Sequence, residues 1–220
     1  MKVIELHESV TASNDRDADA LRLWMKEEGT LLINLMSSPG SGKTTLLSKT
    51  IEMLKGRLKI AVMEADIASA VDAERIGKLG AESIQVHTDG MCHMDAGMTA
   101  EGLRSMDVKD TDLIFLENVG NLICPAEFDT GAGKKVMILS VPEGDDKPLK
   151  YPLMFRESDA LVISKIDTLP YFNFDMKKCE KYARELNPDI HIFPVSAKSD
   201  EGMQAWTDYL LASVSEWKKK

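Results

Sequence analysis

The chain has 220 residues, a net charge of −9 and 44% hydrophobic residues, which is the composition of a globular protein rather than a disordered one. Its acidic balance argues against general nucleic-acid binding, and its apolar runs fall well short of the roughly 20 residues that span a membrane. The first ten residues lack the apolar core of a signal peptide, and three cysteines do not make a disulfide scaffold, so the sequence favours a cytoplasmic location.

Short apolar strands alternate with helical patterns along the chain. After a leading helix over about 12–28, strands are predicted at 30–38, 58–66, 82–88, 111–119, 135–141, 159–164 and 190–195. Helices are predicted at 43–54, 71–79, 94–106, 174–186 and 201–217. Consecutive apolar positions are typical of strands covered on both faces, so the pattern predicts a doubly wound α/β fold with a mostly parallel sheet and helices on both faces. No linker or repeat interrupts the pattern, which favours a single domain over 1–220.

The turn after the first predicted strand has the composition of a phosphate-binding loop. It reads Ser37-Ser38-Pro39-Gly40-Ser41-Gly42-Lys43-Thr44-Thr45, close to G-x-x-x-x-G-K-[ST]. Small residues let backbone N–H groups face an anion at the start of a helix, while Lys43 would reach the β- and γ-phosphates and Thr44 would hold Mg²⁺. Ser37 stands in place of the first glycine of this motif. A residue other than glycine is allowed there if its φ is negative, as expected at the end of a strand. The structural alternative is a helix cap that happens to contain glycines.

A second motif indicates which nucleotide base would be bound. Ser164-Lys165-Ile166-Asp167 follows the strand 159–164 and resembles the guanine-specific N-K-x-D motif of GTPases. Asp167 could accept hydrogen bonds from guanine N1–H and N2–H₂, and Lys165 could cover the base with its alkyl stem. Ser164 replaces the asparagine, so the loop should lose an amide that braces it; an ordinary strand exit is the alternative to a base site. Ser196-Ala197-Lys198 resembles the element that offers a backbone N–H to guanine O6.

Carboxylates at strand ends are candidates for binding Mg²⁺. Asp66 ends the second predicted strand, Asp72 follows six residues later, and Glu117 ends an apolar run. Mg²⁺ takes one or two carboxylates together with waters and phosphate oxygens. Asp72 or Glu117 could equally position the attacking water, and helix capping or solvent exposure is the structural alternative for each.

A cysteine and histidine set offers softer ligands. Cys92 and His93 are adjacent after a short predicted strand, and Cys124 follows another strand end. Thiolate and imidazole suit Zn²⁺ and Ni²⁺, but three ligands leave a site incomplete unless a twofold axis doubles them. Buried, inert thiols are the structural alternative, which we favour for Cys179 because it lies within a helical pattern.

Four segments carry a family resemblance: SSPGSGKTT (37–45), CHMDA (92–96), ENVGNLICPAEFD (117–129) and VPEGDDKPLKYP (141–152), with DAERI (72–76) and SKID beside them. Together they closely resemble the hydrogenase nickel-incorporation GTPases, the HypB family, over nearly the whole chain from about residue 30. The resemblance implies a P-loop NTPase of the SIMIBI-type G-domain class. The related urease accessory GTPases carry a C-P-H metal motif that this chain lacks. The chain also lacks the His-rich stretch and N-terminal cysteine cluster of some HypB members.

The resemblance implies a GTP-hydrolysing metallochaperone that delivers Ni²⁺ to the large-subunit precursor of nickel–iron hydrogenase, with the metallochaperone HypA as a partner. Its implied cofactors are GTP, Mg²⁺ and Ni²⁺ or Zn²⁺, and it implies a homodimer formed on GTP binding, with Lys150 near the nucleotide. Three other classes remain open: a urease-type nickel GTPase, a general P-loop kinase or ATPase with structural cysteines, and a metal-storage protein.

Overall fold

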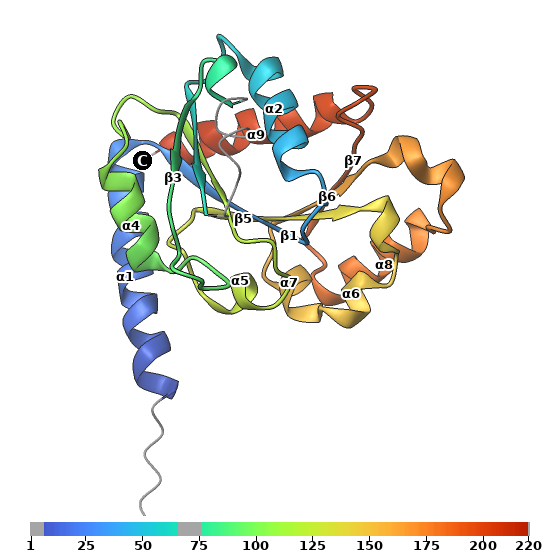
Figure 1. Cartoon of the computed structure of the whole chain (residues 1–220), viewed down its shortest axis with the longest axis horizontal. Coiled ribbons are helices and arrows are strands. Elements are labelled where there is room, and N and C mark those ends of the chain that lie inside the picture. The colour runs from blue at the N-terminus through green and yellow to red at the C-terminus, as the bar shows by residue number, and fades with distance from the viewer. Residues whose placement is uncertain (1–6, 66–75, 220) are drawn as a thin grey trace, which may run out of the picture.

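In the computed structural model, residues 7–65 and 76–219 are described, and their strands form one seven-stranded sheet between layers of helices (Figure 1). The strands are β1 (Leu31–Ser37), β2 (Ile60–Glu64), β3 (Glu82–Gln85), β4 (Leu113–Glu117), β5 (Lys134–Ser140), β6 (Ala160–Ser164) and β7 (His191–Pro194). They lie in the order β3-β2-β4-β1-β5-β6-β7, and every neighbouring pair is parallel. The predicted doubly wound α/β fold is confirmed.

The long helices agree with the sequence pattern, and the short ones were missed. The helices are α1 (His7–Glu28), α2 (Lys43–Leu54), α4 (Ala96–Arg104), α5 (Cys124–Glu127), α6 (Lys147–Lys150), α7 (Pro152–Arg156), α8 (Met176–Leu186) and α9 (Met203–Lys218), with 3-10 turns η1 (Val141–Glu143) and η2 (Ile166–Tyr171). The leading helix begins earlier than the expected residue 12. The short helices α5 to α7 each have a proline in their first turn and too few residues to show a helical period. Of the predicted helix 71–79, only its end from Ile76 lies within the described residues.

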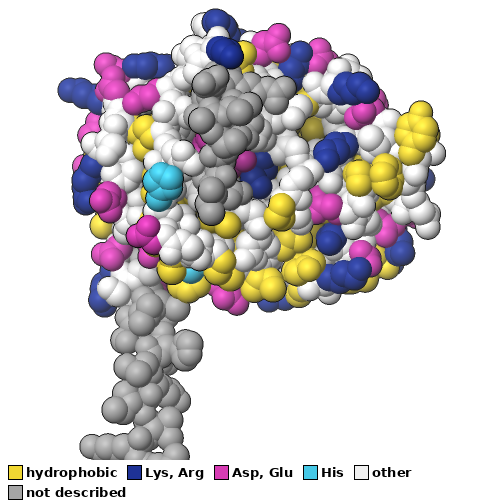
Figure 2. Space-filling view, in the orientation of Figure 1, with side chains coloured by type: hydrophobic (Ala, Val, Ile, Leu, Met, Phe, Trp, Pro, Cys, Tyr) yellow, Lys and Arg dark blue, Asp and Glu magenta, His cyan; other side chains and the backbone are white. Residues whose placement is uncertain are grey.

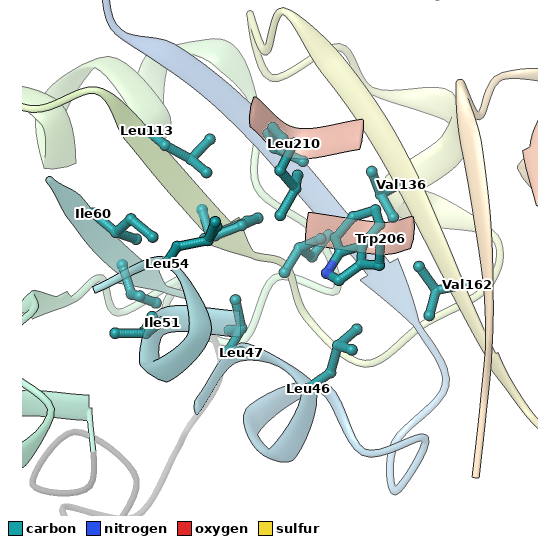
Figure 3. Close-up of a cluster of buried hydrophobic side chains, with 14 of the residues drawn as sticks. Leu46, Leu47, Ile51, Leu54, Ile60, Leu113, Val136, Val162, Trp206 and Leu210 are labelled. Carbon is teal, nitrogen blue, oxygen red and sulfur yellow. The ribbon is translucent and has the colours of Figure 1, made fainter. Parts of the chain in front are cut away.

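One face of the sheet packs against α2 and α9. Figure 3 shows this cluster, in which Leu47 and Leu54 of α2 and Trp206 of α9 meet side chains from the strands. Trp206 is 1% exposed, and its indole N–H donates to the Thr50 hydroxyl at 3.0 Å, so the one polar atom of the ring is satisfied inside the core. Every residue of β1, β2, β4 and β6 is buried, as expected for strands covered on both sides.

The opposite face is covered in two parts. Helices α1 and α4 lie side by side over the β2–β4 half, while α7 and α8 cover β5 and β6 (Figure 1). Because the strands are parallel, their carboxyl ends share one edge of the sheet, and the loops that follow β1, β4 and β6 meet there. No helix within the described residues is long and apolar enough to cross a membrane.

Candidate nucleotide and metal sites

The loop between β1 and α2 has the backbone of an anion-binding turn. Strand β1 ends at Ser37 and α2 begins at Lys43, with Gly40 at φ +75° and Gly42 at φ +94°. Only glycine adopts such φ values without strain, which explains both residues. The first N–H groups of α2 have no partner inside the helix and are available to an anion in this loop.

Ser37 has a defined role in place of the missing glycine. It lies within β1, as the sequence predicted, and is fully buried. Its hydroxyl accepts hydrogen bonds from Lys43 Nζ at 2.9 Å and from the Ser41 hydroxyl at 2.7 Å, and donates to the Ser38 carbonyl at 2.8 Å. The serine therefore positions the lysine of the loop.

The Ser164-Lys165 turn braces the same loop from β6. The Ser164 hydroxyl donates to the Ser41 carbonyl at 2.8 Å in a buried position, and Lys165 Nζ donates to the Gly40 carbonyl at 2.6 Å. Lys165 itself adopts a left-handed φ of +60°, which turns the chain sharply after the strand. The amide brace of the N-K-x-D motif is thus replaced here by a hydroxyl brace from Ser164.

The Asp167 side chain is oriented by Ser196, from the predicted Ser196-Ala197-Lys198 segment. The Ser196 hydroxyl donates to Asp167 Oδ1 at 2.7 Å and also accepts the Ser199 N–H at 3.2 Å. Ser196 is fully buried, whereas Asp167 and Ala197 are partly exposed. The structure thus brings the S-K-x-D turn and the Ser196-Ala197 segment together, as a base-binding site requires.

The predicted magnesium ligands can be placed only in part. Thr44 is partly exposed in the first turn of α2, and Glu117 is 8% exposed at the end of β4, the strand next to β1. A hydroxyl and a carboxylate at the shared edge are oxygen ligands of the kind Mg²⁺ prefers. Asp66 and Asp72 lie outside the described residues.

Cys92, His93 and Cys124 come together as the sequence suggested. Their ligand atoms all lie within 4.8 Å of one another, with the two sulfur atoms 2.8 Å apart and His93 Nδ1 3.7 Å from Cys92 Sγ. The His93 ring is buried and stacks on Phe128, with ring centroids 3.8 Å apart. Two sulfurs and one nitrogen fit Zn²⁺ or Ni²⁺ and leave a further coordination position open.

The surroundings of these ligands change their protonation. Burial lowers the pKa of His93, which keeps the imidazole neutral and able to bind metal. The neighbouring Cys92 thiol and burial raise the pKa of Cys124, although the Asn121 amide opposes this by donating to its sulfur at 3.4 Å. Cys179 is different: it lies within α8 and is fully buried against the core, and burial raises its pKa to about 12, so the packing prediction is confirmed.

The segment that follows β4 packs against the phosphate loop and then leads to Cys124. Gly120 lies against the phosphate loop so closely that a Cβ there would come 2.9 Å from Pro39 Cγ. The Asn118 side chain accepts the Met94 N–H at 3.1 Å and donates to the Asn34 side chain in β1 at 3.0 Å. Asn118 thus joins the Cys92-His93 segment to the segment that leads to Cys124. Asn118 and Gly120 both lie in the segment 117–129 that carries the family resemblance, but the sequence gave no sign of these contacts.

The phosphate loop, its serine brace and the oriented Asp167 define a P-loop nucleotide-binding protein that also carries a Cys/His cluster. The family described as CobW/HypB/UreG, nucleotide-binding domain, matches residues 31–194. The hydrogenase maturation factor HypB of Escherichia coli K12 is 46% identical over 209 residues, covering 95% of this chain and 72% of that protein. The chain belongs to the HypB group of this family.

Two solved structures agree with this assignment. HypB from Archaeoglobus fulgidus has a TM-score of 0.87 at 37% identity, covering 92% of this chain and 99% of that one. HypB from Helicobacter pylori, solved in complex with nickel, has a TM-score of 0.88 at 36% identity and covers 94% and 98% of the two chains. These identities are high enough to support membership of the HypB group and not only a shared fold.

The last predicted nucleotide contact, Lys150, is exposed on α6, where its ammonium lies 2.5 Å from Asp146. This ion pair raises the pKa of Lys150 and lowers that of Asp146. Lys150 is therefore an exposed cation that pairs with Asp146 of its own chain, and its predicted place near nucleotide stays a prediction.

Proposed function

We propose that this protein is a GTP-hydrolysing metallochaperone, acting as a single P-loop domain with an N-terminal helix, that carries Ni²⁺ for nickel–iron hydrogenase maturation. The observation that carries the proposal is the contact of Gly120 with Pro39, which joins the segment leading to Cys124 to the phosphate loop. A nucleotide that moves this loop would then move a metal ligand. The names of the relatives and the nickel complex of the Helicobacter pylori structure support the cargo.

GTP would bind at the edge of the sheet where the carboxyl ends of the strands meet. The N–H groups of residues 40–45 and the Lys43 ammonium would surround the phosphates, and Thr44 with Glu117 would hold Mg²⁺, which would neutralise phosphate charge. Recognition of guanine would come from Asp167, held by Ser196, with the Ala197 N–H facing O6 and the Lys165 stem along the base. In hydrolysis, Glu117 or Asp72 would orient the water that attacks the γ-phosphate.

Ni²⁺ would be held by two thiolates and the His93 imidazole, with Zn²⁺ as a competitor for the same ligands. The open coordination position suits a transfer site, because a receiving ligand can enter before the first ones leave. A homodimer formed on GTP binding would bring two such clusters together, and HypA and the hydrogenase large-subunit precursor are the proposed donor and acceptor partners.

The surface around the cluster supports such a dimer. Hydrophobic side chains gather along the lower edge of the molecule over α5, α6 and α7 (Figure 2). Exposed large hydrophobic residues on these helices include Ile123 at the start of α5, Leu149 of α6 and Leu153 of α7. Met91, also exposed, directly precedes Cys92, and Ile123 directly precedes Cys124. Apolar side chains that flank metal ligands are suited to a face that is covered on association.

A metal titration of the protein with GTP analogue or GDP bound tests the proposal. We expect Ni²⁺ affinity and the monomer–dimer ratio, measured by competition with a chromophoric chelator and by ultracentrifugation, to differ between the two forms. Equal affinities would remove the coupling from the proposed function. Preference for ATP over GTP in the same preparation would instead favour a general P-loop kinase or ATPase with structural cysteines.

Replacing Asp167 with asparagine should weaken GTP binding and favour xanthosine triphosphate. The asparagine amide can donate a hydrogen bond to the xanthine O2. With guanine, the same amide leaves one N–H of the base without an acceptor. That unpaired donor costs about 1–3 kcal/mol, or roughly tenfold to a hundredfold in affinity. Competition between the two nucleotides against a fluorescent analogue measures the change. Asp189→Asn, an exposed carboxylate near the opposite end of β6 and β7, is the control and should leave the preference unchanged.

Replacing Gly120 with alanine should lower nucleotide affinity about tenfold, because the new methyl group would press on Pro39 and overpacking costs about 1–3 kcal/mol. Gly77→Ala is the matched control, since a Cβ there meets nothing within 4 Å. Isothermal titration with a GTP analogue distinguishes them. If both alanine variants bind like the parent protein, the close contact between the two segments has no influence on the loop.

A further inference from the structure

A single side chain of the N-terminal helix bridges the two segments that carry the metal ligands. Asn14 Nδ2 donates to the Asp129 carbonyl at 2.9 Å, and Asn14 Oδ1 accepts the Ala96 N–H at 3.0 Å. Ala96 follows His93 by three residues, and Asp129 directly follows Phe128, the ring on which His93 stacks. One amide group therefore links the segment after His93 to the segment after Cys124.

Helix α1 is firmly seated on one of these segments. Arg22 donates to the Ala132 carbonyl at 3.2 Å and pairs with the Asp129 carboxylate at 2.7 Å. Gly131, at φ +76°, approaches Leu21 so closely that a Cβ would lie 2.7 Å from its Cδ2. These contacts reach only the segment 129–132. Among the described hydrogen bonds of α1, those of Asn14 alone also reach the start of α4.

The backbone that follows His93 is held from both sides by asparagine side chains. Asn118 accepts the Met94 N–H, and Asn14 accepts the Ala96 N–H, one of the donors that the first turn of α4 leaves without a helical partner. Asp95 caps the same helix through the Met98 N–H at 2.8 Å. With these amides fixed, the Cys92-His93 pair has little freedom to move away from Cys124.

We infer that Asn14 is a positioning residue for metal binding, which sets the spacing between the Cys92-His93 pair and Cys124. This inference rests on the proposed metal function of that cluster. It makes α1 part of the metal site, although the helix itself supplies no ligand. Side chains that orient metal ligands from outside the coordination sphere typically change metal affinity about 10–100-fold when they are removed.

The test compares Asn14→Leu with Arg22→Leu. Both variants remove hydrogen bonds between α1 and the segment 129–132, so both should lower the melting temperature of the metal-free protein. Only Asn14→Leu should raise the Ni²⁺ dissociation constant, by about tenfold, with GTP-analogue affinity unchanged. Asn14→Asp, which keeps the acceptor for Ala96 but loses the donor to Asp129, should fall between Asn14→Leu and the parent protein. Parent-like Ni²⁺ affinity in Asn14→Leu, or an equal loss in Arg22→Leu, would overturn the inference.

A second readout needs no nickel. Phenylarsine oxide joins two nearby thiols: two S–As bonds form, and both thiol protons leave with the arsenical oxygen as water. The reaction should be slower in Asn14→Leu than in the parent protein and Arg22→Leu, with Cys124→Ser as the unreactive control. If the parent protein binds no Ni²⁺, the proposed cargo fails while this rate still decides whether Asn14 sets the sulfur spacing. Equal rates in all three proteins would reject the role of Asn14.

Discussion

Replacing Lys43 with alanine should abolish GTP hydrolysis, with a fall of about 10²–10³-fold or more in turnover. Lys43 is 7% exposed, and its ammonium is already directed by Ser37, so little reorganisation is needed when phosphate arrives. In the proposed site this buried cation would act where charge develops on the γ-phosphate, and the first turn of α2 contains no other lysine that could take its place. A phosphate-release assay at saturating GTP measures the loss.

Lys49→Ala is the matched control, because it removes a lysine from the same helix. Lys49 pairs with Asp200 at 2.8 Å on the surface, and its alanine variant should retain turnover. Nucleotide affinity should be measured for both variants, since Lys43→Ala that still binds GTP would show that the lysine acts mainly on the transition state. Undiminished turnover in Lys43→Ala would refute the assignment of this loop.

The sequence was sufficient to predict the strands and long helices because their signal is local. β1, β2, β4 and β6 are apolar at successive positions, and α2 follows a glycine turn, so strand and helix types could be assigned without tertiary information. The short helices between β4 and β6 were missed since each is stabilised by its packing and its proline start rather than by a helical period. The order of strands in the sheet is also a tertiary property, which no local pattern contains.

The candidate site residues could be chosen from the sequence where chemistry limits the residue type. Lys43, Asp167 and the three soft ligands have side chains that few structural roles demand together. Ser164 shows the limit, because its brace depends on a 2.8 Å distance to Ser41 across 123 residues of sequence. Asn14 and Asn118 show it more strongly: an asparagine in a polar helix, or in a loop after a strand, has no distinctive signature. The role of each is visible only when the two segments that it bridges are seen together.

Replacing Cys92 or Cys124 with serine should raise the dissociation constant for Ni²⁺ by about a hundredfold or more, beyond what the loss of an outer positioning residue costs. A hydroxyl is a harder and far less acidic ligand than a thiol, and with one thiolate gone only two soft ligands remain in each chain. GTP binding should be unchanged, because neither cysteine lies in the phosphate loop. Competition with a chromophoric chelator measures the affinity.

Cys179→Ala is the matched control, since that thiol of α8 is fully buried in the core and its raised pKa of about 12 keeps it protonated. It should bind Ni²⁺ like the parent protein while losing some stability. The pH dependence offers a further check: because the pKa of Cys124 is raised, metal must displace its proton, so Ni²⁺ affinity should rise as pH increases and fall as it decreases. Unchanged nickel affinity in both ligand variants would mean that the cation binds elsewhere, and the coupling through Gly120 would then have no metal ligand to move.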